Sequence, residues 1–137
     1  MSDNRMAEAL LEVMPYPDKR YSPLVLICKN GEVGKQLLDR FKEVCADEKI
    51  ILTDGCASII NDSITDFTAD QNVCVMFENL QKFAGNQVYE QRFFEIFNSA
   101  FEKSAAILIT LNDNIRHFPF EGRNRSRLLW GIKEEIT

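Results

Sequence analysis

Four almost continuous apolar runs of strand length are spaced along the chain. They cover residues 23–28, 50–53, 72–77 and 105–111, and a fifth, less uniform run covers 128–136. Apolar runs without regular polar alternation are typical of strands that are covered on both faces, as in parallel sheets. The pattern therefore predicts a five-stranded parallel sheet.

The segments between these runs carry apolar residues at helical spacing. The predicted helices cover 4–13, 35–46 and 86–103, with a weaker one at 57–67. Pro15 and Pro17 stop the first helix, and residues 29–34, which contain two glycines, are predicted to form a turn. Strands that alternate with helices indicate an α/β fold in which helices sandwich the sheet.

Chain length predicts the number of domains, and the ends of the predicted strands give the expected position of the site. The 137 residues suffice for one domain and are too few for two, so we expect residues 1–137 to form a single domain. Ligands of such sheets bind beyond the carboxyl ends of the strands. The polar residues at these ends lie in 29–35, at Glu78 and Asn79, and at Asn112.

Charge and cysteine content narrow the function classes. Because the net charge is -5, and surfaces for duplex DNA or acidic lipid need clustered Lys and Arg, we expect neither partner. The four cysteines form no CxxC pair, which argues against a zinc site or redox dithiol. The sequence has no signal core and no membrane-spanning apolar run, so we expect a cytoplasmic protein with free thiols.

Residues 29–36 resemble a phosphate-binding loop. The pattern GxxxxGK[ST] follows a strand and opens a helix, and here that place reads Lys-Asn-Gly-Glu-Val-Gly-Lys-Gln. Gly34 and Lys35 match, and the backbone at Asn30, Gly31 and Gly34 would favour an anion through its N–H groups and the helix dipole. A plain strand-to-helix turn would contain the same Gly–Lys pair.

Three residues depart from that pattern. Lys29 replaces the first glycine, Gln36 replaces the Ser or Thr that binds magnesium, and Glu32 adds a negative charge. Two unit charges about 4 Å apart interact by roughly 4 kcal/mol at an effective dielectric constant of about 20. An inward-pointing Glu32 would therefore cancel several good hydrogen bonds to phosphate, whereas a solvent-facing one would cost little.

Glu78 and Asn79 follow the third apolar run. P-loop enzymes use an acid in this place to hold magnesium or to polarise water. Glu78 is accordingly the candidate metal ligand and catalytic acid, whereas the amide of Asn79 cannot act as a general base. A solvated strand end would give the same pair of residues.

The order of these motifs resembles the AAA+ domain of the bacterial replication initiator DnaA and of its shortened relative Hda. The resemblance rests on five segments, which are 4–9, 21–26, 78–85, 93–98 and 125–131. The last segment, Arg-Ser-Arg-Leu-Leu-Trp-Gly, resembles the box that holds the family's arginine finger. Together the segments span nearly the whole chain.

The resemblance implies a P-loop NTPase (AAA+) fold and a role for each matched residue. Lys35 would face the phosphates of ATP or ADP, Glu78 would take the magnesium position, and Asn79 would stand where the neighbouring acid is expected. Asn112 would lie near the sensor position. Arg127 would be the finger that reaches a neighbouring subunit's nucleotide.

The chain also departs from that family. Gln36, Glu78 and Asn79 replace hydrolytic residues, and the sequence ends after the fifth strand, without the helical lid or the duplex-binding helix-turn-helix domain. The arginine box at 123–127 is retained. We therefore expect a regulatory or adaptor module of replication initiation that binds another AAA+ protein, such as DnaA or a helicase loader. Nucleotide binding and hydrolysis are expected to be weak or absent.

Two other functions stay open. The first is an ATP- or ADP-binding ATPase with weak hydrolysis, in which the remaining lysine and acid hold a diphosphate and a metal. The second is single-stranded DNA binding, because arginines beside Phe118, Phe120 and Trp130 can stack bases; the same aromatics would otherwise pack the fifth strand against the sheet. His117 has no nucleophile at a recognisable spacing, and we expect a loop residue rather than a catalyst.

Overall fold

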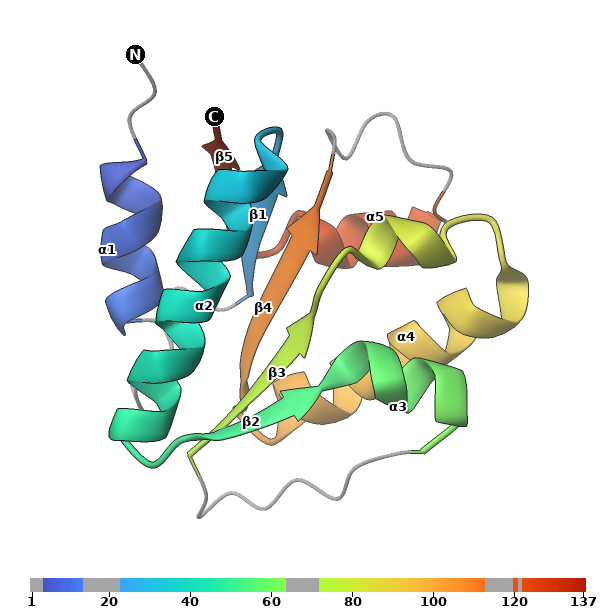
Figure 1. Cartoon of the computed structure of the whole chain (residues 1–137). Coiled ribbons are helices and arrows are strands. Elements are labelled where there is room, and N and C mark those ends of the chain that lie inside the picture. Colours follow the sequence, from blue (N-terminus) through green and yellow to red (C-terminus); the bar gives the residue numbers. More distant parts are fainter. Residues whose placement is uncertain (1–3, 14–22, 64–71, 113–119, 121) are drawn as a thin grey trace.

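A five-stranded parallel sheet forms the centre of the computed structural model, which describes residues 4–13, 23–63, 72–112, 120 and 122–137 (Figure 1). The strands are β1 (Leu24–Cys28), β2 (Ile51–Asp54), β3 (Val73–Phe77), β4 (Ala106–Leu111) and β5 (Ile132–Ile136). Their order across the sheet is β2-β3-β4-β1-β5, and every pairing is parallel. The predicted sheet is confirmed.

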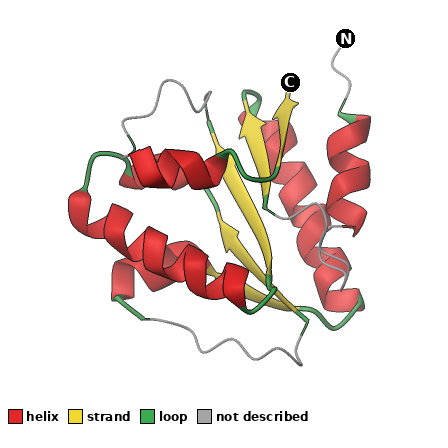
Figure 2. Cartoon of the chain, turned by 180° about the vertical axis from the view of Figure 1, so that it is seen from behind, coloured by secondary structure: helices red, strands yellow, loops and turns green. Residues whose placement is uncertain are grey.

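Helices cover both faces of this sheet (Figure 2). They are α1 (Arg5–Val13), α2 (Gly31–Asp47), α3 (Gly55–Asn61), the short 3-10 helix η1 (Leu80–Phe83), α4 (Gln87–Glu102) and α5 (Gly122–Leu128). α1 and α2 lie on one face, and α3, α4 and α5 lie on the other. β5 is the last element of the described residues, and no helix follows it there.

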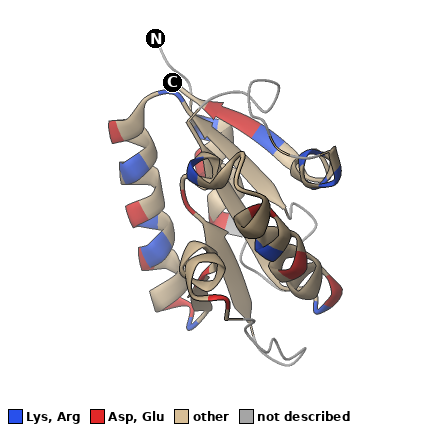
Figure 3. Cartoon of the chain, turned by 90° about the vertical axis from the view of Figure 1, so that its right-hand side faces the viewer, with Lys and Arg blue, Asp and Glu red and all other residues tan. Residues whose placement is uncertain are grey.

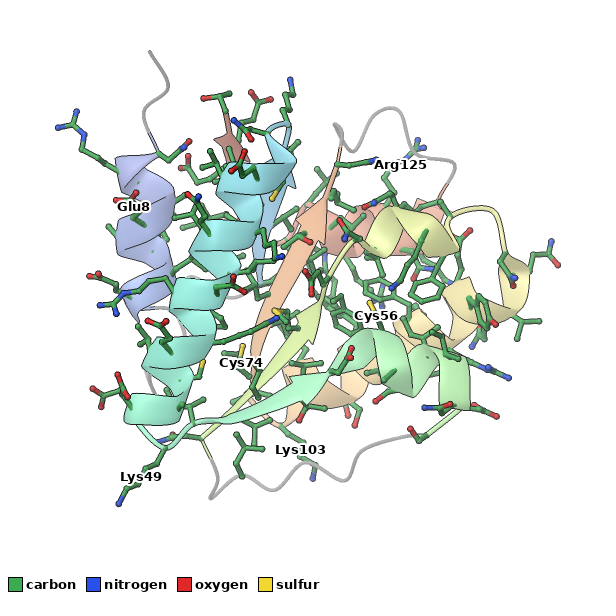
Figure 4. The ribbon with its side chains drawn as sticks, in the orientation of Figure 1. Glu8, Lys49, Cys56, Cys74, Lys103 and Arg125 are labelled. Carbon is green, nitrogen blue, oxygen red and sulfur yellow. The ribbon has the colours of Figure 1, made fainter. Side chains whose placement is uncertain are left out.

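Alternate residues of each strand point to opposite helix layers, as the pleat of a strand requires. In β1, Leu24 and Leu26 pack in the cluster beneath α1 and α2, while Val25 packs in the cluster beneath α3, α4 and α5. Figure 4 labels one buried thiol of each cluster, Cys74 and Cys56. Because both faces are covered, every residue of β3 and β4 is buried, which explains the continuous apolar runs.

α4 has the apolar stripe that the sequence predicts. The side-chain oxygen of Asn86 accepts a hydrogen bond from the backbone N–H of Tyr89 at 3.2 Å and starts the helix. The buried apolar residues of the helix are Phe93, Ile96, Phe97 and Ala100. Phe101, which the periodicity places in the same stripe, lies in the last turn of the helix and is instead 47% exposed.

The predicted fifth strand begins later than expected. Leu128, the first residue of the predicted run, is in α5 and is fully buried, and β5 starts only at Ile132. The turn between them is tight: a Cβ atom on Gly131 would lie 1.5 Å from the carbonyl oxygen of Pro23. The backbone N–H of Ile132 donates to that same oxygen at 3.1 Å and starts the pairing of β5 with β1.

Other predictions have mixed outcomes. The weak helix at 57–67 exists in part, because α3 starts at Gly55, where the carboxylate of Asp54 accepts from the N–H of Ala57 at 3.1 Å. Several predicted positions lie outside the described residues, namely 64–67, Pro15, Pro17, His117 and Phe118.

None of the helices in the described residues is long and apolar enough to cross a membrane.

Candidate functional site

A cavity of about 270 Å³ opens at the carboxyl edge of the sheet, between the ends of β1, β3 and β4 and the start of α2. This is the position that parallel α/β sheets use for ligands. Its lining is formed by Cys28, Gly31, Gly34, Lys35, Leu38, Glu78, Asn79, Thr110 and Asn112. Six of these residues were predicted from the sequence, and Cys28, Leu38 and Thr110 were not.

The predicted turn at 29–34 is wrong from residue 31 onward, because residues 31–34 form the first turn of α2. Only Lys29 and Asn30 separate β1 from this helix, and the N–H groups of both donate to the carbonyl oxygen of Ile136 on β5, at 3.0 and 3.3 Å. The same stretch that would form a phosphate loop is therefore helix, and the strand-to-helix connection is short.

Asn30 closes the start of α2. Its side-chain oxygen accepts from the N–H of Val33 at 3.2 Å, and its carbonyl oxygen accepts from the N–H of Gly34 at 3.0 Å. The first N–H groups of a helix are the ones that normally bind an anion. In this arrangement the N–H of Val33, one of the groups that could hold phosphate, is already bonded to the Asn30 side chain, and the N–H of Gly34 makes the first regular bond of the helix.

Gly34 and Gly31 differ in their surroundings. A Cβ atom on Gly34 would lie 2.9 Å from the Sγ atom of Cys28, so a glycine at this position lets α2 approach β1 closely. A Cβ atom on Gly31 would meet nothing within 4 Å. The requirement for glycine at position 34 is thus explained by helix–strand packing, without a ligand.

The lysine and the glutamine that follow have different positions. The side chain of Lys35 is exposed at the rim of the cavity, where a charged ligand would meet it. Gln36, which stands at the magnesium position of the pattern, lines a different cavity of about 310 Å³ between α1 and α2, with Glu8 and Arg40. Gln36 therefore does not lie with Glu78.

Glu78 and Asn79 follow β3 at the cavity wall. The backbone of Asn79 is left-handed, with φ of 56°, and its N–H donates to the Oγ1 atom of Thr110 at 2.8 Å. The carbonyl oxygen of Glu78 accepts from the thiol of Cys56 at 3.3 Å. These bonds fix the backbone of the pair and leave the Glu78 carboxylate as the acidic group of the lining.

Thr110 was missed by the sequence analysis. It is 2% exposed in β4 and joins the ends of β3 and β4 through its bond to Asn79. The signal that would have identified it is a single hydroxyl in the otherwise apolar run Ala106–Leu111, since a buried hydroxyl needs a hydrogen-bond partner.

Arg127 does not reach the cavity. Its Nε atom donates to the side-chain oxygen of Asn98 at 2.8 Å, and its Nη1 atom donates to the carbonyl oxygen of Arg123 at 3.0 Å. The guanidinium lies over the ring of Phe94, 4.2 Å from its centroid, and 5.0 Å from the centroid of Trp130. The predicted finger is thus folded onto α4 within its own chain.

These positions test whether a magnesium nucleotide fits the site. Among the described residues, no three acidic, histidine or cysteine side chains gather as metal ligands, and Glu78 is the one carboxylate of the lining. The capped start of α2 offers fewer N–H donors than an open phosphate loop. The cavity and Lys35 match the ligand position, but the donor set for phosphate and magnesium does not fit in this arrangement.

Burial raises the pKa of the cysteines near the site. It raises the pKa of Cys45 and of Cys56 to about 11. The pKa of Cys28 is also raised, mainly by burial and in addition by the negative charge of Glu78. Neutral thiols therefore line the core and the wall of the cavity at physiological pH.

We expect iodoacetamide at pH 8 to modify Cys28 first and to leave Cys45 and Cys56 almost untouched. The thiolate is the reactive form, and a pKa of about 11 leaves only about one thiolate per thousand thiols at pH 8. Cys28 is also the one free thiol of the four that is not fully buried. A time course by peptide mass spectrometry at pH 8 and at pH 10 measures this order. Labelling of Cys45 as fast as in urea would contradict the structure.

Sequence comparison finds a DnaA protein. The chain is 28% identical to the chromosomal replication initiator protein DnaA of Campylobacter curvus, over 88% of this chain and 30% of that protein. No protein-family model matches the chain. The chain thus spans less than a third of the length of this relative.

Solved structures give the fold. Domain III of the Thermotoga maritima replication initiation protein DnaA superposes with a TM-score of 0.80 at 17% identity, over 98% of this chain and 62% of that one. AMPPCP-bound DnaA from Aquifex aeolicus also gives 0.80 at 17% identity, over 97% of this chain and 46% of that one. The described five-stranded sheet with its helices has the fold of the DnaA AAA+ domain.

Proposed function

We propose that this DnaA-like AAA+ chain is a module of replication initiation that acts through contact with another protein and does not depend on ATP hydrolysis. The carrying observation is the start of α2, where Asn30 bonds to Val33 and Gly34 in place of an open phosphate loop. A chain with this closed site keeps the fold as a scaffold for contacts. Its nucleotide site is degenerate in this proposal.

The residues of the cavity also support the absence of hydrolysis. Activation of water needs a base near the third phosphate, and Asn79 supplies an amide at that place. Gln36, at the magnesium position of the motif, lines another cavity. Glu78 alone provides a carboxylate there, and one carboxylate does not replace both groups.

The proposed partner is another AAA+ protein of replication, of the DnaA or helicase-loader type. The relative in Campylobacter curvus is a chromosomal replication initiator, which supports that context. The arginines of α5 support a contact role, because they are retained in a chain whose hydrolytic positions are altered.

One specific observation favours a second candidate function, a nucleotide-binding module with weak hydrolysis. The cavity lies at the expected position with Lys35 and Asn112 at its wall, and a solved DnaA structure carries AMPPCP. In this alternative, ligand binding would unwind the first turn of α2 and expose its N–H groups.

Calorimetric titration of the purified chain with ATP and with ADP, with and without magnesium, separates the two functions. We expect no binding heat up to about 1 mM nucleotide, which corresponds to less than about 4 kcal/mol of binding free energy. A micromolar dissociation constant, about 8 kcal/mol, would contradict the closed site and favour the nucleotide-binding alternative.

The contact itself is tested with the purified DnaA protein of the same cell by size-exclusion chromatography. We expect a complex, and we expect Lys35→Ala in this chain to leave the complex intact because Lys35 is exposed at the cavity and acts only on a charged ligand. Loss of the complex in Lys35→Ala would indicate that nucleotide at this site controls the contact. Absence of any complex would contradict the proposed partner.

A further inference from the structure

The last turn of α4 and the turn that follows α5 expose apolar side chains beside arginines. Phe101 is 47% exposed, Leu129 is 51% exposed and Trp130 is 48% exposed. The guanidinium of Arg127 lies 5.0 Å from the centroid of the Trp130 ring, and Arg123 precedes it by one helical turn. We call these five residues the aromatic–arginine surface.

The aromatic part of this surface is held by contact with the core. The ring centroids of Phe101 and Trp130 are 5.1 Å apart, and both rings contact Phe97, at 6.1 and 5.8 Å. Phe97 is fully buried. The exposed rings therefore present fixed apolar faces, and a partner that covers them loses little side-chain freedom.

The two arginines are also held in place. Their guanidinium carbons both lie 4.2 Å from the centroid of the Phe94 ring. Arg123 additionally donates to the side-chain oxygen of Gln91, and Arg127 donates to Asn98. A guanidinium has five N–H donors in a fork. Arg127 uses its Nε and Nη1 atoms in these bonds to Asn98 and to the carbonyl oxygen of Arg123, and its Nη2 atom can donate to a further acceptor.

α5 itself is fastened to α4 beneath the arginines. The side-chain nitrogen of the buried Asn124 donates to the carbonyl oxygen of Glu90 at 2.9 Å, and Leu128 is buried in the core cluster. The helix that carries the arginines therefore keeps its position when a ligand arrives.

Charge decides which kind of partner fits. α5 contains three arginines and no acidic residue (Figure 3), although the whole chain has a net charge of -5. In the described part of α4, Glu95 and Glu102 are exposed acids. An arginine fork forms paired hydrogen bonds with a carboxylate, and exposed aromatic residues beside arginine are the composition of strong protein contacts.

The surface is separate from the cavity. Phe101 ends α4 just before β4 begins, and Trp130 precedes β5, so both residues lie at the amino edge of the sheet. The cavity lies at the carboxyl edge. A protein bound at the surface would leave the cavity open.

We propose that the aromatic–arginine surface binds an acidic segment of a partner protein, with carboxylates on Arg123 and Arg127 and apolar side chains on Phe101, Leu129 and Trp130. This inference rests on the proposed function, in which the chain works by protein contact, and adds the place and the chemistry of that contact. A group of three exposed apolar side chains suits a short segment rather than a whole domain.

A labelled peptide tests this directly. The probe is a short fluorescein-labelled peptide in which Glu and Asp alternate with Leu and Phe, titrated with the full chain and followed by anisotropy. Trp130 is the single tryptophan of the chain, so its emission reports contact at the surface. We expect binding with a change in Trp130 emission, and a loss of about tenfold or more when Gln and Asn replace the acids of the peptide.

Variants locate the contact. We expect Trp130→Ala and Arg127→Lys each to weaken binding by about tenfold. Arg127→Lys keeps the charge but removes the guanidinium fork together with its bonds to Asn98 and to the carbonyl oxygen of Arg123, so urea unfolding of both variants is measured beside the titration. Arg40→Ala is the matched control, because Arg40 is an exposed arginine on α2 whose partner is Glu43, and it should bind the peptide normally.

Each of three results with the peptide would overturn the inference. The first is that the acidic peptide does not bind, and the second is that Trp130→Ala and Arg127→Lys bind it as tightly as the original chain does. The third is tighter binding of an oligothymidylate of matched length, which would identify a nucleic-acid surface. If the chain still forms a complex with purified DnaA while both variants leave that complex intact, the proposed function stands and this surface is wrong. If the peptide binds as expected but no DnaA complex forms, the surface stands and the partner is wrong.

Discussion

A chain that carries Asn30→Gly, Glu32→Gln and Gln36→Thr is expected to bind magnesium ADP at least about tenfold more tightly than the original chain, or about 1.4 kcal/mol. The first change frees the N–H of Val33, which now bonds to the Asn30 side chain. A hydrogen bond from such a group to a charged phosphate contributes about 1.5–3 kcal/mol. The second change removes a carboxylate from the first turn of α2. The third gives position 36 the residue type of the motif, which can serve magnesium only if the first turn of α2 unwinds, because residue 36 lines the other cavity in the original chain.

The matched control for Asn30→Gly is Asn86→Gly. Asn86 starts α4 with the same geometry, a 3.2 Å bond from a backbone N–H to its side-chain oxygen. Glycine costs only a few tenths of a kcal/mol at such a position, so both variants should have nearly the original stability. Calorimetry with ADP then isolates the effect at α2. Equal affinities for ADP in the original chain, in the triple variant and in Asn86→Gly would show that the cap of α2 does not limit nucleotide binding.

Gly131→Ala is expected to lower the free energy of unfolding by about 3 kcal/mol or more, and Tm by roughly 10 °C. The added Cβ atom would lie 1.5 Å from the carbonyl oxygen of Pro23 and 2.6 Å from its carbon. The clash is with backbone, which has no rotamer to change. Relief requires β5 to shift, and this shift breaks the bond from Ile132 to Pro23 that starts the β1–β5 pairing.

Gly122→Ala is the companion variant. Nothing lies within 4 Å of a Cβ atom at that position, and alanine is favoured over glycine in a helix by about 0.5–1 kcal/mol. Its stability should equal or exceed that of the original chain in urea unfolding. A small loss in Gly131→Ala, comparable to Gly122→Ala, would contradict the close approach of β5 to Pro23.

The sheet was predictable because burial on both faces leaves a direct trace in sequence. β3 and β4 are buried along their whole length, so the apolar runs have no regular polar alternation to confuse them with exposed strands. The layers of helices follow from the same fact, since a sheet covered on both faces needs helices on both sides. The similarity to the DnaA fold agrees with this derivation.

The start of α2 was not predictable from glycine content alone. Two glycines in 29–34 suggest a turn, yet the helix begins at Gly31 because Asn30 caps it. The local signal was present, since an asparagine three residues before a bonded N–H is a common helix start. A phosphate loop and a capped helix start can be written with the same residues, so the motif alone does not distinguish them.

The hydrophobic pattern also did not predict which of the α4 side chains are buried and which are exposed. Periodicity places Phe93, Phe94 and Phe101 near one stripe, but the structure buries Phe93, covers Phe94 with two arginines and exposes Phe101. The arginine box was recognised by its spacing, whereas the fold of Arg127 onto Phe94 depends on α4, which is distant in sequence. Contacts between elements decide such positions.

β1 stands between β4 and β5, the two strands of the described sheet that come latest in the chain. It pairs with β4 on one side and with β5 on the other, so a nascent chain has the first strand of its sheet long before either neighbour exists. Pairing between segments that are distant in sequence is slow and leaves apolar edges exposed meanwhile. During synthesis, Leu24–Cys28 therefore gains its first sheet partner only when β4 has emerged and its second only when β5 has emerged, and its apolar edges stay unpaired in the interval.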